Sequence, residues 1–166
     1  MNTEFRQLAD DELDAAYEII CAAVDWLLSR NIRQWTAPLP RHIYEQRQAE
    51  GQNHALVYDG QIAVVLSILE EAHPYWRNEL GGEERVWLST VTTAPCFRGR
   101  QLGRLAIREA LAFLKGRGIE SLFLDCVHGD GFLPAYYESV GFATVARKDI
   151  EYPLGAFDMV LMRKDL

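Results

Sequence analysis

Apolar and polar positions along the chain repeat with two different periods, and each change of period marks an expected element. From Asp10 to Asn31 the apolar residues, among them Leu13, Ile20 and Val24, recur close to every 3.6 positions, which predicts a long helix. The acidic residues at its start suit the positive end of a helix dipole. A stripe of the same period predicts a helix at residues 103–115. Two shorter helices are expected at residues 41–50 and 132–139, each followed by a glycine that ends it.

Runs of β-branched and apolar residues predict the strands. Asp59-Gly60 lies between the runs His54–Tyr58 and Gln61–Leu69, and this dipeptide between two apolar runs is a strong hairpin signal. Further strands are expected at residues 3–8, 86–94, 121–127, 142–151 and 156–163. Prolines and glycines predict loops at residues 35–40 and 70–85. Helices and strands therefore mix in one α/β domain that spans residues 1–166.

Composition and charge exclude several classes of protein. The chain has 166 residues and a net charge of -7, whereas nucleic-acid binding needs a basic surface; a cationic small molecule suits this charge better. Its three cysteines and four histidines show no paired or ligand spacing, so we expect neither a disulfide framework nor a metal site. The first residues lack the basic-then-apolar pattern of a signal peptide, and no apolar run approaches the ~20 residues of a membrane helix. We therefore expect a cytoplasmic protein with no membrane partner.

The most informative segment is Thr93-Ala-Pro-Cys-Phe-Arg-Gly-Arg-Gln-Leu-Gly-Arg104. It follows a predicted strand, contains two glycines and three arginines, and leads into an amphipathic helix. Backbone N–H groups and a helix dipole then meet at one point, which favours a bound anion such as a diphosphate. The segment is not a Walker loop, because no Lys-Ser/Thr pair follows its glycines. The simpler alternative is a surface turn whose arginines are solvated.

Part of this segment, Phe97-Arg-Gly-Arg-Gln-Leu-Gly103, resembles the pyrophosphate-binding loop of the GNAT superfamily of N-acetyltransferases, usually Arg/Gln-x-x-Gly-x-Gly/Ala. Arg98 matches its first position and Gly103 its last. Gln101 stands where the family usually has its inner glycine, and a positive φ there would cost about 1 kcal/mol.

Two more blocks carry the resemblance. Residues 122–142 resemble the family's strand, short helix and Gly-Phe, and they place Tyr137 where the family has a tyrosine acid. Asp130 replaces the usual Asn and can cap the short helix by accepting backbone N–H bonds. Trp26-Leu-Leu-Ser-Arg-Asn-Ile-Arg-Gln-Trp35 is similar to a bacterial subgroup with a Trp-Leu…Gln-Trp signature.

The resemblance implies the GNAT fold, a mixed central sheet with helices on both sides, and acetyl-CoA as co-substrate. An amine would attack the acetyl thioester directly, with backbone amides near the end of strand 86–94 stabilising the oxyanion and that strand splaying from strand 121–127. Tyr137 would protonate the leaving thiolate, although the same tyrosine could serve only as a packing aromatic. The implied cofactor-binding residues are Val91, Thr93, Arg98, Gly99, Arg100, Gln101, Leu102, Gly103, Arg104 and Asp130.

The acceptor side is less defined. The expected substrate-binding residues are Trp26, Gln34, Trp35, Glu71 and Asp125, and Trp26 is equally explained by core packing. The candidates for the general base are Glu70, Glu71, His73 and Asp125, each of which could instead be a solvated loop charge. The main expectation is acetyl transfer to a small cationic primary amine. A protein N-terminus or lysine as acceptor, and a non-catalytic acyl-CoA sensor suggested by Gln101 and Asp130, stay open. By analogy with relatives, a homodimer is also expected.

Overall fold

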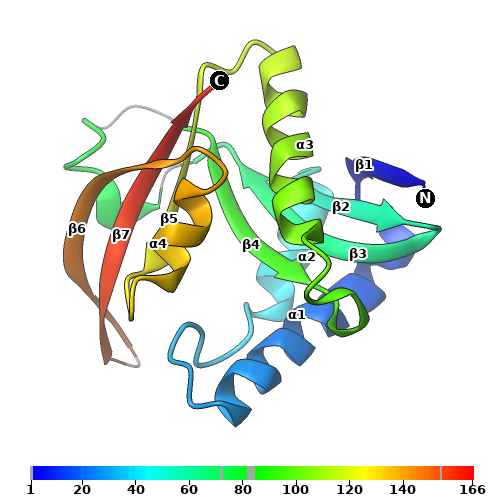
Figure 1. The fold of residues 1–166 in the computed structure, drawn as a ribbon, viewed down its shortest axis with the longest axis horizontal. Coiled ribbons are helices and arrows are strands. Elements are labelled where there is room, and N and C mark those ends of the chain that lie inside the picture. Colours follow the sequence, from blue (N-terminus) through cyan, green and yellow to red (C-terminus); the bar gives the residue numbers. More distant parts are fainter. Residues whose placement is uncertain (1, 72, 82–84, 154) are drawn as a thin grey trace. The chain divides into compact units, whose positions relative to one another are not determined.

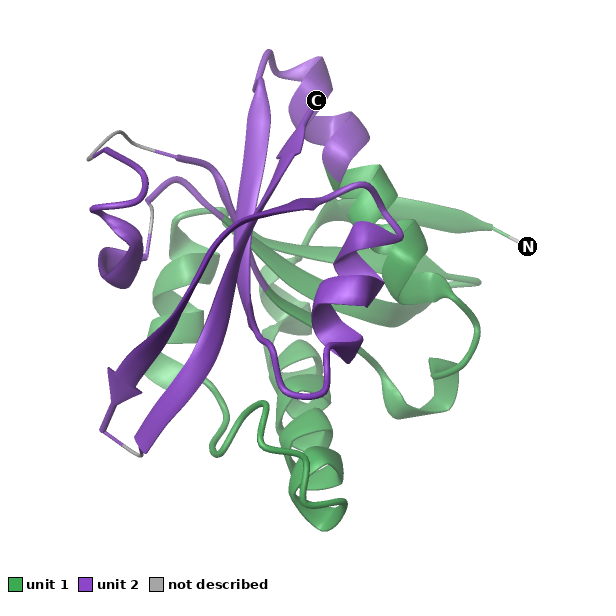
Figure 2. Cartoon of the chain, turned by 60° about the vertical axis from the view of Figure 1, so that its left-hand side comes forward, with its two compact units in different colours: residues 1–68, 90–110 green, residues 69–89, 111–166 purple. Residues whose placement is uncertain are grey.

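The computed structural model describes residues 2–71, 73–81, 85–153 and 155–166. The chain divides into two compact units, the first formed by residues 1–68 and 90–110 and the second by residues 69–89 and 111–166 (Figure 2). The divisions at residues 89/90 and 110/111 fall inside a strand and inside a helix. A single domain over residues 1–166 stays a prediction.

The first unit contains three antiparallel strands and the long helices that the 3.6-residue period predicted (Figure 1). Its elements are β1 (Thr3–Gln7), η1 (Asp10–Glu12), α1 (Leu13–Ser29), α2 (Arg41–Ala49), β2 (Asn53–Tyr58), β3 (Gln61–Leu69), the end of β4 (Trp87–Thr93), η3 (Pro95–Phe97) and the start of α3 (Leu102–Gly116). The predicted β2–β3 hairpin is confirmed, because Tyr58 pairs with Gln61 and both turn residues, Asp59 and Gly60, have positive φ. Two positive φ angles are what a tight two-residue hairpin turn requires.

One hydrophobic core cluster of the first unit lies where helices α1 and α2 cover strands β2 and β3. Its buried members are Leu8, Ala16, Ile20, Tyr44, Ala55 and Val65. Ala16 and Ile20 are one turn apart on α1, so the apolar stripe read from the sequence is the face that packs inward.

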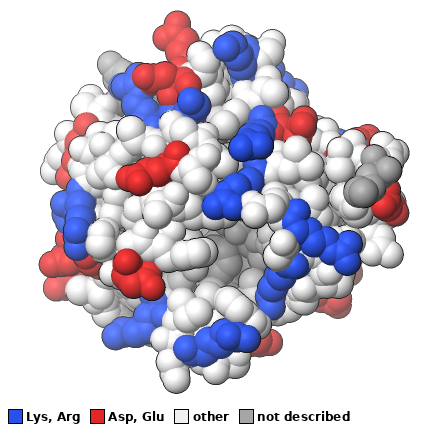
Figure 3. Space-filling model, in the orientation of Figure 1, with Lys and Arg blue, Asp and Glu red and all other residues white. Residues whose placement is uncertain are grey.

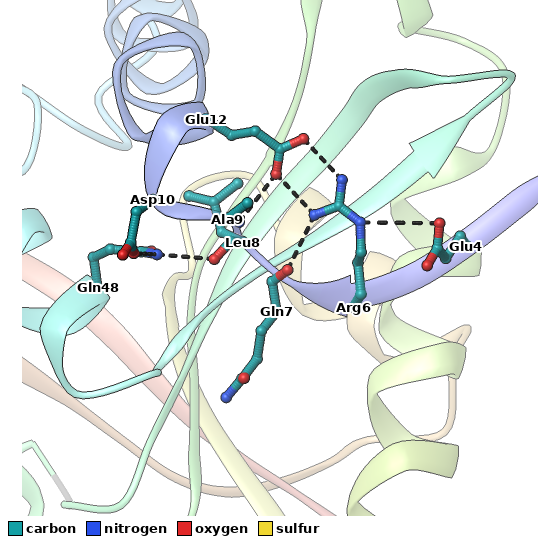
Figure 4. A network of polar contacts seen from close by, with 8 residues as sticks. All are labelled: Glu4, Arg6, Gln7, Leu8, Ala9, Asp10, Glu12 and Gln48. Atoms are coloured by element: carbon teal, nitrogen blue, oxygen red, sulfur yellow. Dashed lines mark hydrogen bonds and ion pairs between the residues drawn. The ribbon is translucent and has the colours of Figure 1, made fainter.

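A polar network ties the beginning of α1 to its neighbours (Figure 4). The Arg6 guanidinium donates two hydrogen bonds to the Glu12 carboxylate, at 2.7 and 2.8 Å. Glu12 also accepts the backbone N–H of Ala9 at 3.0 Å, which satisfies a donor at the helix entry. The Gln48 side chain donates to the Leu8 carbonyl at 2.8 Å. The start of α1 is thereby fixed to β1 and to α2.

The second unit contains both parallel and antiparallel strand pairings. Its elements are η2 (Pro74–Trp76), the start of β4 (Trp87–Thr93), the end of α3, β5 (Ser121–Val127), α4 (Phe132–Glu138), β6 (Ala143–Tyr152) and β7 (Gly155–Asp165). Strand β4 runs parallel to β5, with Trp87 opposite Phe123. Strand β7 pairs antiparallel with both β5 and β6. Because β4 belongs to both units, the strands of the described chain follow the hydrogen-bonded order β1-β2-β3-β4-β5-β7-β6, which confirms a mixed α/β fold.

The loop predicted at residues 70–85 needs correction. It contains the 3-10 turn η2, and Trp76 is fully buried in the core of the second unit beside Trp87, Phe123 and Leu161. The many polar residues, proline and glycines around Trp76 conceal this anchor in the sequence pattern. Residues 72 and 82–84 of the predicted loop lie outside the described residues.

Charges of both signs are interspersed on the face of the molecule shown in Figure 3, so the net charge of -7 does not make this face uniformly acidic. Within the described ranges, no helix combines the length and apolar character needed to cross a membrane. In the same part of the chain, no group of three or more His, Cys, Asp or Glu side chains could hold a metal ion.

Candidate active site

Strand β4 is distorted just before the residues expected to carry the oxyanion amides. Thr90 has φ +56°, a left-handed conformation that is strained for a β-branched residue. Arg47 Nη1 donates to the Thr90 hydroxyl at 3.0 Å, and the Thr92 hydroxyl donates to the Thr90 carbonyl at 3.0 Å. Backbone strain of this kind is concentrated at functional sites, and Thr90 directly precedes Val91 in β4. Thr90 could not be predicted from the sequence, because threonine in a β-rich run gives no signal of a left-handed residue.

The loop between β4 and α3 has the geometry of an anion cradle. Gly99 has φ +78° and Gln101 has φ +63°, and α3 begins directly afterwards at Leu102. The first-turn amides of a helix have no intrahelical acceptor, so those of α3 are suited to a negative ligand. Gln101 thus has the positive φ angle whose cost was considered from the sequence. Its side-chain oxygen accepts a hydrogen bond from the Arg104 guanidinium. These features fit the diphosphate of a coenzyme A molecule.

The first unit brings two predicted site residues together. The Arg98 guanidinium lies 4.7 Å from the ring centre of Trp26, and that of Arg30 lies 4.9 Å from the same ring. Trp26 is 37% exposed, so the interpretation of Trp26 as a core residue is wrong: it lies on the outer side of α1. Gln34 and Trp35 lie in the segment between α1 and α2, and both are partly exposed.

Tyr137 lies on α4 in the second unit and packs edge-on against Tyr136 and Phe142, with ring centres 5.3 and 6.0 Å away. Burial raises the pKa of the Tyr137 hydroxyl, and the neighbouring Cys126 thiol adds to that increase. The phenol therefore keeps its proton at neutral pH, as a general acid must. The ring contacts are equally those of a packing aromatic.

Asp130 has the local role that was expected of it. Its Oδ1 accepts the backbone N–H of Phe132, the first residue of α4, at 3.0 Å. Gly131, between them, has φ +88°. The carboxylate thus holds the turn that leads from β5 into the helix of Tyr137.

The interpretation of Asp125 as a solvated loop charge is wrong. Asp125 lies within β5, and its carboxylate accepts a hydrogen bond from the indole N–H of the fully buried Trp76 at 2.9 Å. Burial raises the pKa of the Asp125 carboxyl, while the Trp76 hydrogen bond and the charge of His73 act against the increase. The other candidates differ: Glu70 and Glu71 are exposed, and His73 is partly buried.

The predicted residues thus form two groups, each within one unit. In the first unit, the arginine-bearing loop meets Trp26 of α1. In the second unit, Tyr137 and Asp125 lie close enough for the Asp125 charge to raise the pKa of Tyr137. Neither meeting follows from a local pattern, because Arg98 is far from Trp26 along the chain, and Asp125 and Tyr137 belong to different elements, β5 and α4.

Comparison with known proteins agrees with this description. The sequence model of the acetyltransferase (GNAT) family matches residues 20–142. No curated protein has a matching sequence.

Solved structures share the fold at low identity. A GNAT-family acetyltransferase from Listeria monocytogenes is 19% identical, with a TM-score of 0.82 over 99% of this chain and 95% of that one. A structure from Salmonella typhimurium determined with its cofactor acetyl-CoA is 18% identical, with a TM-score of 0.72 over 100% and 95% of the two chains. The ribosomal-protein-S18-alanine N-acetyltransferase of Escherichia coli is 20% identical, with a TM-score of 0.71 over 99% and 94%. The family match covers both the anion cradle and the tyrosine helix, and this chain belongs to the acetyltransferase (GNAT) family.

Proposed function

We propose that this protein transfers the acetyl group of acetyl-CoA to the primary amine of a small cationic molecule. The observation that carries the proposal is the backbone conformation of the loop at residues 98–103. Two of its residues, Gly99 and Gln101, have left-handed φ angles, and α3 begins directly after them. Gln101 adopts this conformation although it is not glycine. The loop therefore adopts this conformation at a cost in backbone strain, which supports the binding of an acyl-CoA. An enzyme and a non-catalytic acyl-CoA sensor would share this loop, so turnover is what separates them.

The first unit supplies the proposed cofactor site. Arg98, Arg100 and Arg104 and the amides of the loop and the first turn of α3 would hold the diphosphate. Acetyl-CoA itself supplies the activated thioester. The backbone amides of Val91 and Thr93, which follow the strained Thr90, would donate to the oxygen that becomes negative when the amine attacks.

The second unit supplies the proposed acid. The Tyr137 hydroxyl would give its proton to the departing sulfur. Burial acts on both partners of this proton transfer. It raises the pKa of the Tyr137 phenol, so the phenol gives up its proton less readily, and it raises the free energy of a thiolate in the same surroundings, so the thiolate takes up a proton more readily. The two effects offset each other, so the proton transfer is feasible at a buried site although the pKa of Tyr137 is raised.

Asp125 is the best supported of the four candidate bases. A partly buried carboxylate with a raised pKa accepts a proton at neutral pH more readily than an exposed one. The exposed Glu71 is better suited to attracting a cationic acceptor than to removing its proton. Trp26, Gln34 and Trp35 would complete the acceptor side from the first unit.

Titration calorimetry with acetyl-CoA tests the cofactor site. We expect micromolar binding that is weakened at least tenfold in Arg98→Ala. Arg108→Ala is the matched control, since Arg108 is exposed on α3 outside the loop, and it should bind as the wild type does. Release of free thiol from acetyl-CoA, followed over a panel of amines, then tests turnover. Absence of binding at millimolar acetyl-CoA would overturn the proposal.

A further inference from the structure

The ring of Trp26 carries two guanidinium groups that come from different segments of the chain. The Arg98 guanidinium lies 4.7 Å from the centre of the ring, and that of Arg30 lies 4.9 Å from it. Trp26 is a residue of α1, Arg30 directly follows that helix, and Arg98 directly follows η3. All three belong to the first unit. One indole therefore joins the end of α1 to the loop that would hold the diphosphate.

Core packing does not account for the position of this ring. The buried stripe of α1 runs through Ile20, Val24 and Leu27, and Trp26 lies outside it with 37% of its surface exposed. A guanidinium is a favourable cover for an exposed aromatic face, because it is planar, delocalised and more weakly hydrated than an ammonium group. The ring of Trp26 therefore holds cations at the surface of the first unit.

The backbone beside Arg98 is fixed independently of Trp26. Phe97 is buried, and its ring meets the Tyr58 ring edge-on with centres 5.8 Å apart. The Phe97 N–H also donates to the Ala94 carbonyl at 2.9 Å. With the backbone anchored at Phe97, the freedom that remains to Arg98 lies in its long side chain, which has many rotamers. The contact with the Trp26 ring is what restricts that side chain.

A neutral partner leaves the charge of Arg98 uncompensated. Among the residues that the structure describes, no carboxylate forms an ion pair with Arg98, and its aromatic partner Trp26 is uncharged. A carboxylate would have to be displaced before a phosphate could bind. An indole face attracts the charge without accepting strong hydrogen bonds from the guanidinium N–H groups. Arg98 is thus held in one place while its charge and its donors stay suited to an anion.

Arg30 places a second positive charge at the same ring. Both guanidinium groups lie over one ring centre, so their separation cannot exceed the sum of the two distances to that centre. This is within one Debye length, which is about 10 Å at 0.1 M salt. The two like charges repel each other in the free protein, and a diphosphate bound at the loop would relieve that repulsion.

We propose that Trp26 is a positioning residue for the cofactor, which holds the Arg98 guanidinium ready for the diphosphate of acetyl-CoA, while Arg30 strengthens the positive field at longer range. A side chain that is held before binding loses less conformational entropy when the ligand arrives, so the ligand binds more tightly. Trp26 thereby acts on cofactor affinity through Arg98, and this role is separate from any contact of the ring with the acceptor amine. The inference rests on the binding of acetyl-CoA proposed above.

Calorimetry with acetyl-CoA in the absence of any amine measures this role, because an effect on the acceptor alone cannot contribute to it. Trp26→Leu keeps an apolar side chain and removes the aromatic face, and we expect the Kd for acetyl-CoA to rise about fivefold. Trp26→Phe keeps a ring for the guanidinium and should bind within about twofold of the wild type. Leu28→Ala is the control, since it changes another exposed apolar side chain of α1, and it should bind as the wild type does.

A double-mutant cycle separates positioning from a general structural effect. In an Arg98→Ala background the guanidinium that Trp26 holds is absent, so Trp26→Leu should then change the Kd by less than about twofold. A ring that only supported the fold would lower the affinity about fivefold in both backgrounds, because such an effect does not pass through Arg98.

Salt tests the second charge. Arg30→Gln keeps a long polar side chain and removes the charge, and we expect it to raise the Kd about twofold at 0.1 M salt. The change should disappear at 1 M salt, where the Debye length falls to about 3 Å. A change of equal size at both salt concentrations would contradict a long-range role of Arg30.

The outcomes distinguish this inference from the proposed function. If the wild type binds acetyl-CoA and Trp26→Leu binds it equally well, or weakens binding equally with and without Arg98, the inference fails and the proposed function stands. If the wild type does not bind acetyl-CoA, the proposed function fails and the inference fails with it.

Discussion

The guanidinium of Arg47 donates a hydrogen bond to the hydroxyl of Thr90 at 3.0 Å, and Thr90 has φ +56° in the middle of β4. Asn31, Asp59 and Gln101 also have positive φ, but of these four residues only Thr90 is β-branched. Burial lowers the pKa of Arg47, which is the mark of a desolvated guanidinium. Helix α2 thus holds a strained residue in place in the strand that precedes the proposed cofactor loop.

Substitution of Thr90 should reveal that strain. Thr90→Gly and Thr90→Val both remove the hydroxyl that Arg47 contacts, but only glycine adopts φ +56° without a steric cost. We expect Thr90→Val to be less stable than Thr90→Gly by about 1–2 kcal/mol. Urea unfolding of the two variants measures the difference directly. Equal stabilities would show that this position stores no backbone strain.

Gln101 gives a second, independent measure of backbone strain. Gln101→Gly and Gln101→Ala both lose the side-chain oxygen that Arg104 contacts, and only glycine relieves φ +63°. The glycine variant should therefore be about 1 kcal/mol more stable than the alanine variant. Acetyl-CoA should bind the glycine variant at least as tightly as the wild type, since glycine is the residue that the loop geometry favours. Weaker binding to Gln101→Gly would show that the glutamine side chain itself contacts the cofactor.

Removal of the Tyr137 hydroxyl should affect turnover alone. In Tyr137→Phe the ring contacts with Tyr136 and Phe142 remain, so we expect unchanged acetyl-CoA affinity and a kcat lower by about 10²-fold. The matched control is Tyr136→Phe, which should retain kcat. Steady-state kinetics and calorimetry on both variants check this. A Tyr137→Phe variant with wild-type kcat would assign Tyr137 to packing.

The Arg6–Glu12 pair should make stability depend on pH in the acid range. The hydrogen bond from Arg6 lowers the pKa of the Glu12 carboxyl below its ordinary value of 4.5. A group whose pKa is lowered by folding stabilises the native state above its unfolded pKa, and this stabilisation is lost as the pH falls through the folded pKa. Glu12→Gln should therefore lower the free energy of unfolding by about 1 kcal/mol at pH 7, and it should change it very little at a pH below the folded-state pKa of Glu12.

Urea unfolding of the wild type and Glu12→Gln at pH 7 and at successively lower pH measures that change. Glu4→Gln is the control, because Glu4 is exposed and lies 3.9 Å from Arg6. A difference that is the same at every pH would exclude the ion pair as its source.

The order of elements could be predicted from the sequence because the signals for it are local. The 3.6-residue stripe of α1, the Asp59-Gly60 turn and the apolar run of β5 depend only on neighbours along the chain. The signal for the proposed cofactor loop was equally local, since its glycines, its arginines and the start of the helix are close together in one segment. Resemblance of these consecutive residues to a family loop was enough to predict the family.

Only the tertiary structure decided which side chains meet. The sequence pattern places Trp26 in an apolar helix. In the structure Trp26 lies outside the core, and its ring contacts the guanidinium of Arg98, a residue 72 positions further along the chain. Asp125 reads as one more acidic residue, and its burial becomes visible only when Trp76, concealed in an apparent loop, donates to it. The strained Thr90 in β4 is held by Arg47 from helix α2. Burial, pKa and backbone strain arise from contacts between distant segments, so no local pattern encodes them.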